Sequence, residues 1–337
     1  MDKIIETTSE ILSTVANLVA SYINQNYTES DKKTIYKEID EILGLRIEEC
    51  DLCNVELTYE KVQKVLSAIN EKGSNRKDKG VYYTPHDLVK FITINLAKLS
   101  CGKLKPNNLH ILDLNGIPYE RFCYKKTVFD PTCGAGEFLL VSLELKMDLL
   151  ELHHENVTIG KIVKVINTIF GNDIDVESIA ITKIRLLLAI LHRFGVKKIK
   201  GLAEILNKNF TNADYIESPS DVHGVFDIIV GNPPYVEDSK SNSKPSVKYG
   251  NIYANVLENS SKQLKELGAF GYVIPLSYVS TPRMKKIRDV LDEQLNEQYI
   301  LSYSDRPDCL FTSVHQKLNV FFAKKSEKKV CYTGNYQ

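Results

Sequence analysis

The chain has 337 residues, 43% of them hydrophobic, and its 43 basic side chains balance 43 acidic ones. This composition excludes a wholly disordered chain and a collagen-like repeat, and the length allows one large domain or two ordinary ones. No apolar run approaches the roughly 18–20 residues that span a bilayer, and the acidic, amphipathic start is unlike a secretory signal, so we expect a cytoplasmic protein without a membrane partner.

Residues 1–75 are predicted to form a helical N-terminal domain. Apolar side chains recur every three or four positions over residues 4–22 and over residues 35–43, and a third helix is expected from Thr58 to about Ile69. Residues 1–72 are also acidic, with 8 Lys or Arg against 14 Asp or Glu. We expect these helices to pack on the rest of the chain; a contact surface for a second protein is the alternative.

Cys50 and Cys53 form a lone Cys-x-x-Cys pair among seven widely spaced cysteines. A structural zinc site needs about four ligands, and no second such pair completes one. The cysteines of a cytosolic chain stay reduced. We therefore predict ordinary thiols and no metal. Residues 1–75 also lack a convincing carboxylate–lysine cluster for DNA cleavage, so nuclease activity is not predicted.

A polar stretch over residues 71–80 separates these helices from a second pattern, in which strands alternate with helices. Such alternation is typical of an α/β fold with a doubly wound, mostly parallel, Rossmann-like sheet. Ligands of these sheets bind beyond the carboxyl ends of the strands. The strands are expected over residues 127–130, 167–171, 226–230, 270–274, 298–303 and 318–323, and the helices over residues 137–150, 177–192, 252–267 and 284–295.

The segment Phe129-Asp-Pro-Thr-Cys-Gly-Ala-Gly-Glu-Phe-Leu139 is the first with a chemical implication. A strand ends here, a Gly-x-Gly turn follows and an apolar helix begins, and the two glycines let the backbone approach a ligand closely. The last position of the dinucleotide pattern GxGxxG is Leu139, which disfavours a nicotinamide or flavin site. A plain strand-to-helix turn is the alternative.

The tetrapeptide Asn232-Pro-Pro-Tyr235 directly follows a buried strand. Two prolines fix the backbone and remove two donors, so nearby carbonyls are left to accept from a ligand. Asn232 adds a side-chain amide and Tyr235 a flat aromatic face. The pattern indicates a rigid set of hydrogen-bond acceptors beside a stacking platform.

These segments resemble the S-adenosylmethionine-dependent class I amino-methyltransferases of DNA in the gamma arrangement, and more narrowly the methylase module of type I and fused type II restriction–modification enzymes. The resemblance covers roughly residues 78–325. It implies a class I methyltransferase domain over residues 76–337. Five segments carry it, in the family's order: Gly80–Pro85, Asp130–Phe138, Asn172–Asp175, Asn212–Tyr215 and Asn232–Tyr235.

The resemblance implies S-adenosyl-L-methionine as the cofactor and assigns residues to it. Asp173 would accept hydrogen bonds from the ribose hydroxyls, with Asp175 as the alternative. Asp214 would accept from the adenine amino group, or serve only as a turn carboxylate. The remaining cofactor residues are Tyr83, Thr84 and Pro85 at the methionine end and Asp130, Gly134 and Gly136 along the glycine turn.

The implied reaction is methylation of the exocyclic N6 of adenine in double-stranded DNA, with the base flipped out of the helix. The Asn232 side-chain oxygen and the Pro233 carbonyl would accept hydrogen bonds from the amine, and Pro234 would keep this segment rigid. Tyr235 would stack on the base. Phe311 is a candidate for the second stacking face, and Lys240 and Lys244 are candidates for contacts to phosphate.

The chain ends about a dozen residues after its last expected strand, and no target-recognition domain is visible. We therefore expect a specificity subunit, or a recognition domain beyond this sequence, to read the DNA. The alternative substrates are a protein glutamine amide and an RNA base. An alternative of another class is a non-catalytic subunit that binds the cofactor and recruits partners.

Overall fold

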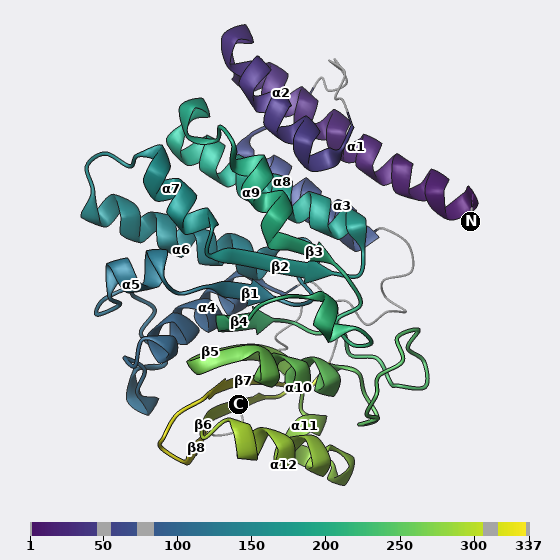
Figure 1. The fold of residues 1–337 in the computed structure, drawn as a ribbon, viewed down its shortest axis with the longest axis vertical. Helices are drawn as coiled ribbons and strands as arrows, with labels where there is room; N and C mark the ends of the chain where they lie inside the picture. Colours follow the sequence, from purple (N-terminus) through teal and green to yellow (C-terminus); the bar gives the residue numbers. More distant parts are fainter. Residues whose placement is uncertain (1, 46–54, 73–83, 306–315, 335–337) are drawn as a thin grey trace.

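The computed structural model describes residues 2–45, 55–72, 84–305 and 316–334, without the side chains of residues 2–9, 71 and 72. Its centre is an eight-stranded sheet with the order β3-β2-β1-β4-β5-β7-β6-β8 (Figure 1). Strand β7 runs antiparallel to β5 and β6, and the other pairs are parallel. The strands are β1 Val128–Asp130, β2 Ile169–Asp173, β3 Phe210–Asn212, β4 Phe226–Gly231, β5 Leu264–Pro275, β6 Glu297–Tyr303, β7 Leu318–Lys324 and β8 Val330–Thr333.

Helices cover both faces of this sheet, and successive residues of the central strands alternate between two apolar clusters. In β5, Ala269 and Val273 join the cluster that includes α4, α6 and α8, whereas Phe270 and Tyr272 join the cluster beneath α10 and α12. The helices after residue 84 are α4 His86–Ser100, α5 Tyr119–Tyr124, α6 Glu137–His153, α7 Ile159–Ile166, α8 Val176–Phe194, α9 Leu202–Asn209, α10 Tyr253–Gln263, α11 Ser277–Ser280 and α12 Lys285–Gln294.

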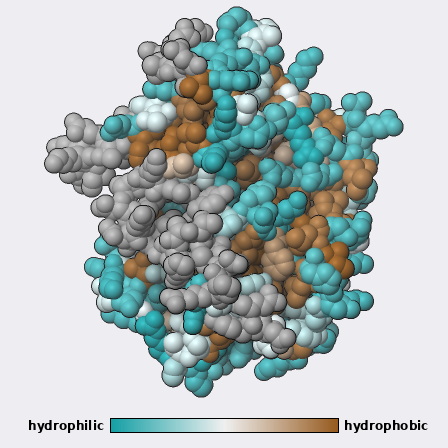
Figure 2. Space-filling model, turned by 180° about the vertical axis from the view of Figure 1, so that it is seen from behind, coloured by the Kyte–Doolittle hydropathy of each residue, from teal (hydrophilic) through white to brown (hydrophobic). Residues whose placement is uncertain are grey.

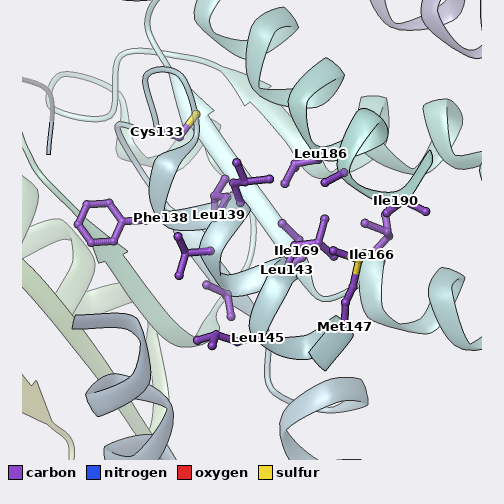
Figure 3. Packing of buried hydrophobic residues seen from close by; sticks show 14 of the residues in the cluster. Cys133, Phe138, Leu139, Leu143, Leu145, Met147, Ile166, Ile169, Leu186 and Ile190 are labelled. Carbon is purple, nitrogen blue, oxygen red and sulfur yellow. The ribbon is translucent and has the colours of Figure 1, made fainter. Parts of the chain in front are cut away.

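In the larger cluster, α6 and α8 pack on β2. Leu139 and Leu143 of α6 lie beside Ile169 of β2, and Leu186 and Ile190 of α8 close the other side (Figure 3). Aliphatic residues at helical spacing on α6 and α8 bury one continuous surface here. The helix that follows the glycine turn is therefore held rigidly against the strand that follows it in the chain.

Helices α1 (Asp2–Asn26), α2 (Glu29–Leu43) and α3 (Tyr59–Lys72) pack against α8 and α9 and join the same apolar cluster. In Figure 1 they lie at the end of the molecule opposite β6 and β8. Glu38 of α2 is 2% exposed, and its carboxylate accepts hydrogen bonds from the backbone N–H groups of Gly201 (2.7 Å) and Ala203 (2.9 Å) at the start of α9. The domain boundary expected near residue 75 lies among residues 73–83, outside the described residues.

The doubly wound α/β fold is confirmed, and every strand and helix expected after residue 80 is present, with shifted ends. The helix expected over residues 252–267 ends at Gln263. Phe226 pairs with Leu264 but Ile228 pairs with Ala269, so residues 265–268 bulge from the sheet. Leu267 adopts a left-handed φ of 61° in this bulge. Among the described residues after residue 84, five helices and two strands were not predicted from the sequence: α4, α5, α7, α9, α11, β3 and β8.

None of the helices in the described part of the chain combines the length and the apolar character that a bilayer span requires. On the face drawn in Figure 2, hydrophobic residues form patches between hydrophilic ones.

A buried charge network ties β4 to the start of β1 and to the bulge of β5. The Asp227 carboxylate accepts from Lys126 Nζ at 3.0 Å, Lys265 Nζ at 2.9 Å and the backbone N–H of Thr127 at 3.1 Å. Burial by itself would raise the pKa of Asp227, but the hydrogen bonds from Lys265, Thr127 and Lys126 outweigh it and lower this pKa to about 2.

Replacing Asp227 by Asn is expected to lower the free energy of unfolding at pH 7 by about 3–5 kcal/mol, because Lys126 stays buried without its counter-charge. Ionised Asp227 stabilises the fold fully above its ordinary pKa of 3.8, and this stabilisation is lost as the pH falls toward 2. Urea unfolding between pH 7 and pH 3 should therefore show a flatter pH dependence in Asp227→Asn. Asp289→Asn, in an exposed pair with Lys285, is the control, with an expected loss below about 1 kcal/mol.

Candidate functional site

A cavity of about 220 Å3 lies at the carboxyl ends of β1 to β4, bordered by the segments that follow these four strands. This is the edge where parallel sheets bind ligands. The cavity brings together seven of the predicted residues, in agreement with the expected location: Gly134, Asp173, Asp175, Asp214, Asn232, Pro234 and Lys240. The predicted residues that do not line it are Thr84, Pro85, Asp130, Gly136, Pro233, Tyr235 and Lys244.

The turn after β1 depends on its two glycines. Gly134 and Gly136 adopt φ values of +53° and +81°. A Cβ on Gly136 would lie 2.4 Å from Thr182 Cγ2, so only glycine lets this turn pack on α8. Thr182 Oγ1 donates to the Gly134 carbonyl at 2.8 Å. Contacts with Thr182 of α8 thereby fix the backbone of the glycine turn at the cavity wall.

Asp130 lies behind this turn rather than in the cavity wall. Its Oδ1 accepts the Thr132 N–H at 3.1 Å, and a Cβ on Gly231 would come within 2.8 Å of the same atom. Burial raises the pKa of Asp130 well above its ordinary value, and the nearby charge of Asp173 raises it further. Asp130 therefore joins the ends of β1 and β4 beneath the cavity.

Asp173 at the end of β2 holds two loops together. Its Oδ2 accepts the Gly134 N–H at 2.8 Å, and its Oδ1 accepts the Asp175 N–H at 3.0 Å. Asp175 also lines the cavity, but its Oδ1 accepts the Glu177 N–H at 3.1 Å and caps α8. Of the two candidates for the ribose contact, Asp173 is the one bonded to the glycine turn.

Asp214 combines the two roles that the sequence left open. Its Oδ1 accepts the N–H groups of Ile216 at 2.9 Å and Glu217 at 3.1 Å, which is the bonding of a turn carboxylate. It also lines the cavity. The turn fixes the direction in which the carboxylate faces the cavity.

Asn172, Thr132 and Ile174 also line the cavity, and sequence reasoning gave them no role. Asn172 Nδ2 donates to the carbonyls of Pro131 (2.9 Å) and Ala213 (3.0 Å) and so joins the loops after β1 and β3. Asn172 Oδ1 and Thr132 Oγ1 are buried and have no hydrogen-bond partner among the described residues. Ile174 is 61% exposed, an unusual position for a large aliphatic side chain.

These three residues carried a signal in the sequence. Asn172 and Ile174 flank the predicted acidic residue at the carboxyl end of a strand, the edge at which such sheets bind ligands. Thr132 lies in the turn between Asp130 and Gly134. The position next to a predicted ligand contact at a strand end therefore marks a residue as a candidate for the cavity wall.

The Asn232 side chain is held at both ends. Its Nδ2 donates to Thr84 Oγ1 at 3.1 Å, and its Oδ1 accepts from the Tyr235 hydroxyl. The same hydroxyl lies 2.9 Å from the Val273 carbonyl. Because a phenol has one proton, it donates to Asn232 or to Val273 at any one time. The Tyr235 ring meets the Tyr253 ring edge-on at a centroid distance of 6.3 Å.

The two predicted lysines lie on the loop after this segment. Lys240 borders the cavity and pairs with Glu237 at 3.3 Å, with both side chains largely exposed. Lys244 is exposed, and its backbone N–H donates to Glu217 Oε2 at 3.2 Å. Tyr83, Phe311, Cys50 and Cys53 lie outside the described residues.

Residues 167–309 match the family described as Eco57I restriction-modification methylase. The type II methyltransferase M.BstVI of Geobacillus stearothermophilus is 25% identical over 205 residues, which cover 57% of this chain and 36% of that protein. The chain spans between 15% and 36% of the length of the curated relatives that it matches.

Solved structures share the fold. The type ISP restriction-modification enzyme LlaBIII bound to DNA aligns with a TM-score of 0.61 at 15% identity, over 98% of this chain and 26% of that one. A protein described as a class I S-adenosylmethionine-dependent methyltransferase from Listeria monocytogenes aligns with a TM-score of 0.52 at 14% identity, over 98% of this chain and 93% of that one. Residues 167–309 thus carry the sequence pattern of a restriction-modification methylase, on the fold of class I S-adenosylmethionine-dependent methyltransferases.

Proposed function

We propose that this chain transfers a methyl group from S-adenosyl-L-methionine to the exocyclic N6 of adenine in DNA, as the methylase of a restriction–modification system. One observation carries the proposal: Asn232, whose amide is fixed in orientation, lines the same cavity as Gly134 and Asp173. A hydrogen-bond acceptor suited to an amine and a cavity suited to a nucleoside therefore share a wall.

The residues around the cavity fit the cofactor. Carboxylates accept hydrogen bonds from ribose hydroxyls, and Asp173 lies where such a contact can form. Ile174 offers an apolar surface for a flat base, and Asn172 Oδ1 is a buried acceptor without a partner among the described residues. When bound, S-adenosylmethionine would supply an electrophilic methyl group attached to a sulfonium. Thr84 joins the site through Asn232, whereas Pro85 precedes α4.

The hydrogen bonds of Asn232 explain how the chain would handle a weak nucleophile. An exocyclic amine is a poor nucleophile because its lone pair is delocalised into the ring. Since Nδ2 donates to Thr84, the atom that would accept from the amine is Oδ1, which also accepts from the Tyr235 hydroxyl. When the Tyr235 hydroxyl donates to the Val273 carbonyl instead of to Asn232, Oδ1 can accept a hydrogen bond from an amine N–H in its place. Positive charge developing on the nitrogen is then stabilised by dipoles already in place.

A basic cluster next to the loop between Asn232 and α10 supports a polyanionic substrate. Arg283, Lys285 and Lys286 are exposed at the start of α12, which has no acidic residue in its first turn. Cations at a helix N-terminus oppose the helix dipole and destabilise the helix unless an anion compensates. Arg283 lies against Gly250, in the loop that leads from Asn232 to α10. A DNA phosphate near this cluster would satisfy the cations and the helix terminus together.

Replacing both Arg283 and Lys286 by Ala is expected to weaken DNA binding and to reduce the slope of log K against log salt by about 2, because two phosphate contacts are lost. Cofactor affinity should stay unchanged. Lys200→Ala with Lys208→Ala removes two exposed lysines near α9 and serves as the matched control. Equal salt slopes for the wild type and the Arg283/Lys286 variant would exclude these phosphate contacts.

The substrate is tested directly by incubating the chain with labelled S-adenosylmethionine and DNA, RNA or protein, with and without a specificity subunit. N6-methyladenine in duplex DNA supports the proposal. Label in RNA, or on a glutamine amide of a protein, would replace it with another amino-methyltransferase activity. Cofactor binding without transfer to any substrate would indicate a non-catalytic subunit.

A further inference from the structure

Helix α3 buries a polar face against the site. Gln63, Ser67 and Asn70 recur at steps of four and three, so they share one side of the helix, and they are 7%, 6% and 5% exposed. On the neighbouring side, Val62 and Leu66 join the apolar core. Buried polar side chains destabilise a fold unless they are paired, so the partners of these three residues indicate their role.

Ser67 and Gln63 act through an ion pair behind the glycine turn. Ser67 Oγ donates to Glu137 Oε1 at 2.8 Å, and Arg185 Nη1 donates to the same oxygen at 2.8 Å. Glu137 is the first residue of α6, directly after Gly136. Gln63 Oε1 accepts from Arg185 Nε at 2.8 Å, and Gln63 Nε2 donates to the Arg185 carbonyl at 3.0 Å.

Arg185 also forms a hydrogen bond to the glycine turn itself. Its Nη1 donates to the Ala135 carbonyl at 2.6 Å, between the two glycines. Its side chain is 4% exposed in the pair with Glu137. Orientation of Arg185 by Gln63, and of Glu137 by Ser67, therefore sets the path of residues 135–137.

Asn70 reaches the cavity wall from the same helix. Its Oδ1 accepts from Ser178 Oγ at 3.0 Å, and Ser178 lines the cavity. Its Nδ2 lies 3.5 Å from the position of a Cβ on Gly134. The polar face of α3 thus contacts the middle of α8 through Gln63. Through Asn70 it contacts both the start of α8 and the glycine turn.

We propose that Gln63, Ser67 and Asn70 are positioning residues that hold the glycine turn in its ligand-binding shape and thereby set cofactor affinity. The inference rests on the proposed function in so far as the ligand is S-adenosylmethionine. Purely structural packing of α3 would be met by apolar side chains alone, as its own Val62 and Leu66 show. The hydrogen bonds of the three polar side chains end instead on Arg185, Glu137 and Ser178. Arg185 in turn donates to the Ala135 carbonyl of the glycine turn, and Ser178 borders the cavity.

The test uses Ser67→Ala and Asn70→Ala, with Ser21→Ala as the matched control. Ser21 is 5% exposed, close to the 6% of Ser67, but its hydroxyl donates to the Asn17 carbonyl within α1. Calorimetry should show S-adenosylmethionine binding about tenfold more weakly to each of the first two variants, as one buried hydrogen bond is lost. Turnover at saturating cofactor and DNA should stay near the wild-type value. Ser21→Ala should match the wild type in both.

Amide hydrogen exchange on the ligand-free protein separates this inference from the proposed function. Faster exchange confined to residues 132–137 and 176–180 in Ser67→Ala and Asn70→Ala supports the positioning role. This holds even if the wild type binds no S-adenosylmethionine. Absence of S-adenosylmethionine binding by the wild type would overturn the proposed function alone. If both variants bind the cofactor as tightly as the wild type and exchange their amide hydrogens at the wild-type rate, the inference is overturned. Faster exchange throughout the chain would also overturn it, because it would indicate global destabilisation.

Discussion

Asn232→Ala is expected to abolish methyl transfer while leaving cofactor affinity nearly unchanged. The change removes the acceptor that would bind the target amine and the amide that Thr84 orients. Loss of one such preorganised dipole typically lowers kcat by on the order of 10²–10³. Turnover with DNA and calorimetric titration with S-adenosylmethionine, measured on the same sample, separate these two effects.

Asn242→Ala is the matched control for this experiment. Asn242 also lines the cavity, but it is exposed and lies on the loop that follows Tyr235. Its replacement should leave kcat close to the wild-type value. Wild-type turnover in Asn232→Ala would remove Asn232 from the reaction, and with it the main support for amine methylation.

Asp173→Ala is expected to weaken S-adenosylmethionine binding by about 2–4 kcal/mol, roughly 30- to 1,000-fold. The variant loses the expected contact to ribose and the hydrogen bonds that Asp173 accepts from Gly134 and Asp175. Asp173→Asn should also bind weakly, because its amide would turn a donor toward one of these N–H groups. Calorimetry of both variants measures the effect.

Asp175→Ala distinguishes the two neighbouring carboxylates. Asp175 caps α8 through the Glu177 N–H, so its loss should lower the free energy of unfolding by about 0.5–2 kcal/mol. Cofactor affinity should change far less than in Asp173→Ala. The opposite pattern, with strong binding in Asp173→Ala and weak binding in Asp175→Ala, would reassign the ribose contact.

The sequence predicts the alternation of elements well where apolar runs are long. Helices α6 and α8 are buried along most of their length and were predicted within a few residues. Strand β3 has three residues and the pattern Phe-Thr-Asn, which is too short to show a period. The end of α10 was misplaced because the bulge at Leu267 depends on pairing with β4, a contact distant in sequence.

The candidate site was predictable where a single segment supplies both the chemistry and the geometry. Gly134, Asp173, Asp214 and Asn232 all border one cavity, as the order of the motifs implies. Tyr235 shows the limit. The sequence presents a flat ring after two prolines, but whether its hydroxyl meets Asn232 and Val273 depends on β5.

The contact between Glu38 and the start of α9 links the N-terminal helices to the elements that border the cavity. Residue 38 supplies the anion for a helix more than 160 positions later, and that helix leads straight into β3 and Asp214. A shorter version beginning after residue 75 would expose the apolar side of α8 and would remove the acceptor of the Gly201 and Ala203 N–H groups, of which Ala203 is buried. The N-terminal quarter therefore packs on the elements that lead to the cavity and completes their hydrogen bonds, and we expect the two parts to unfold together.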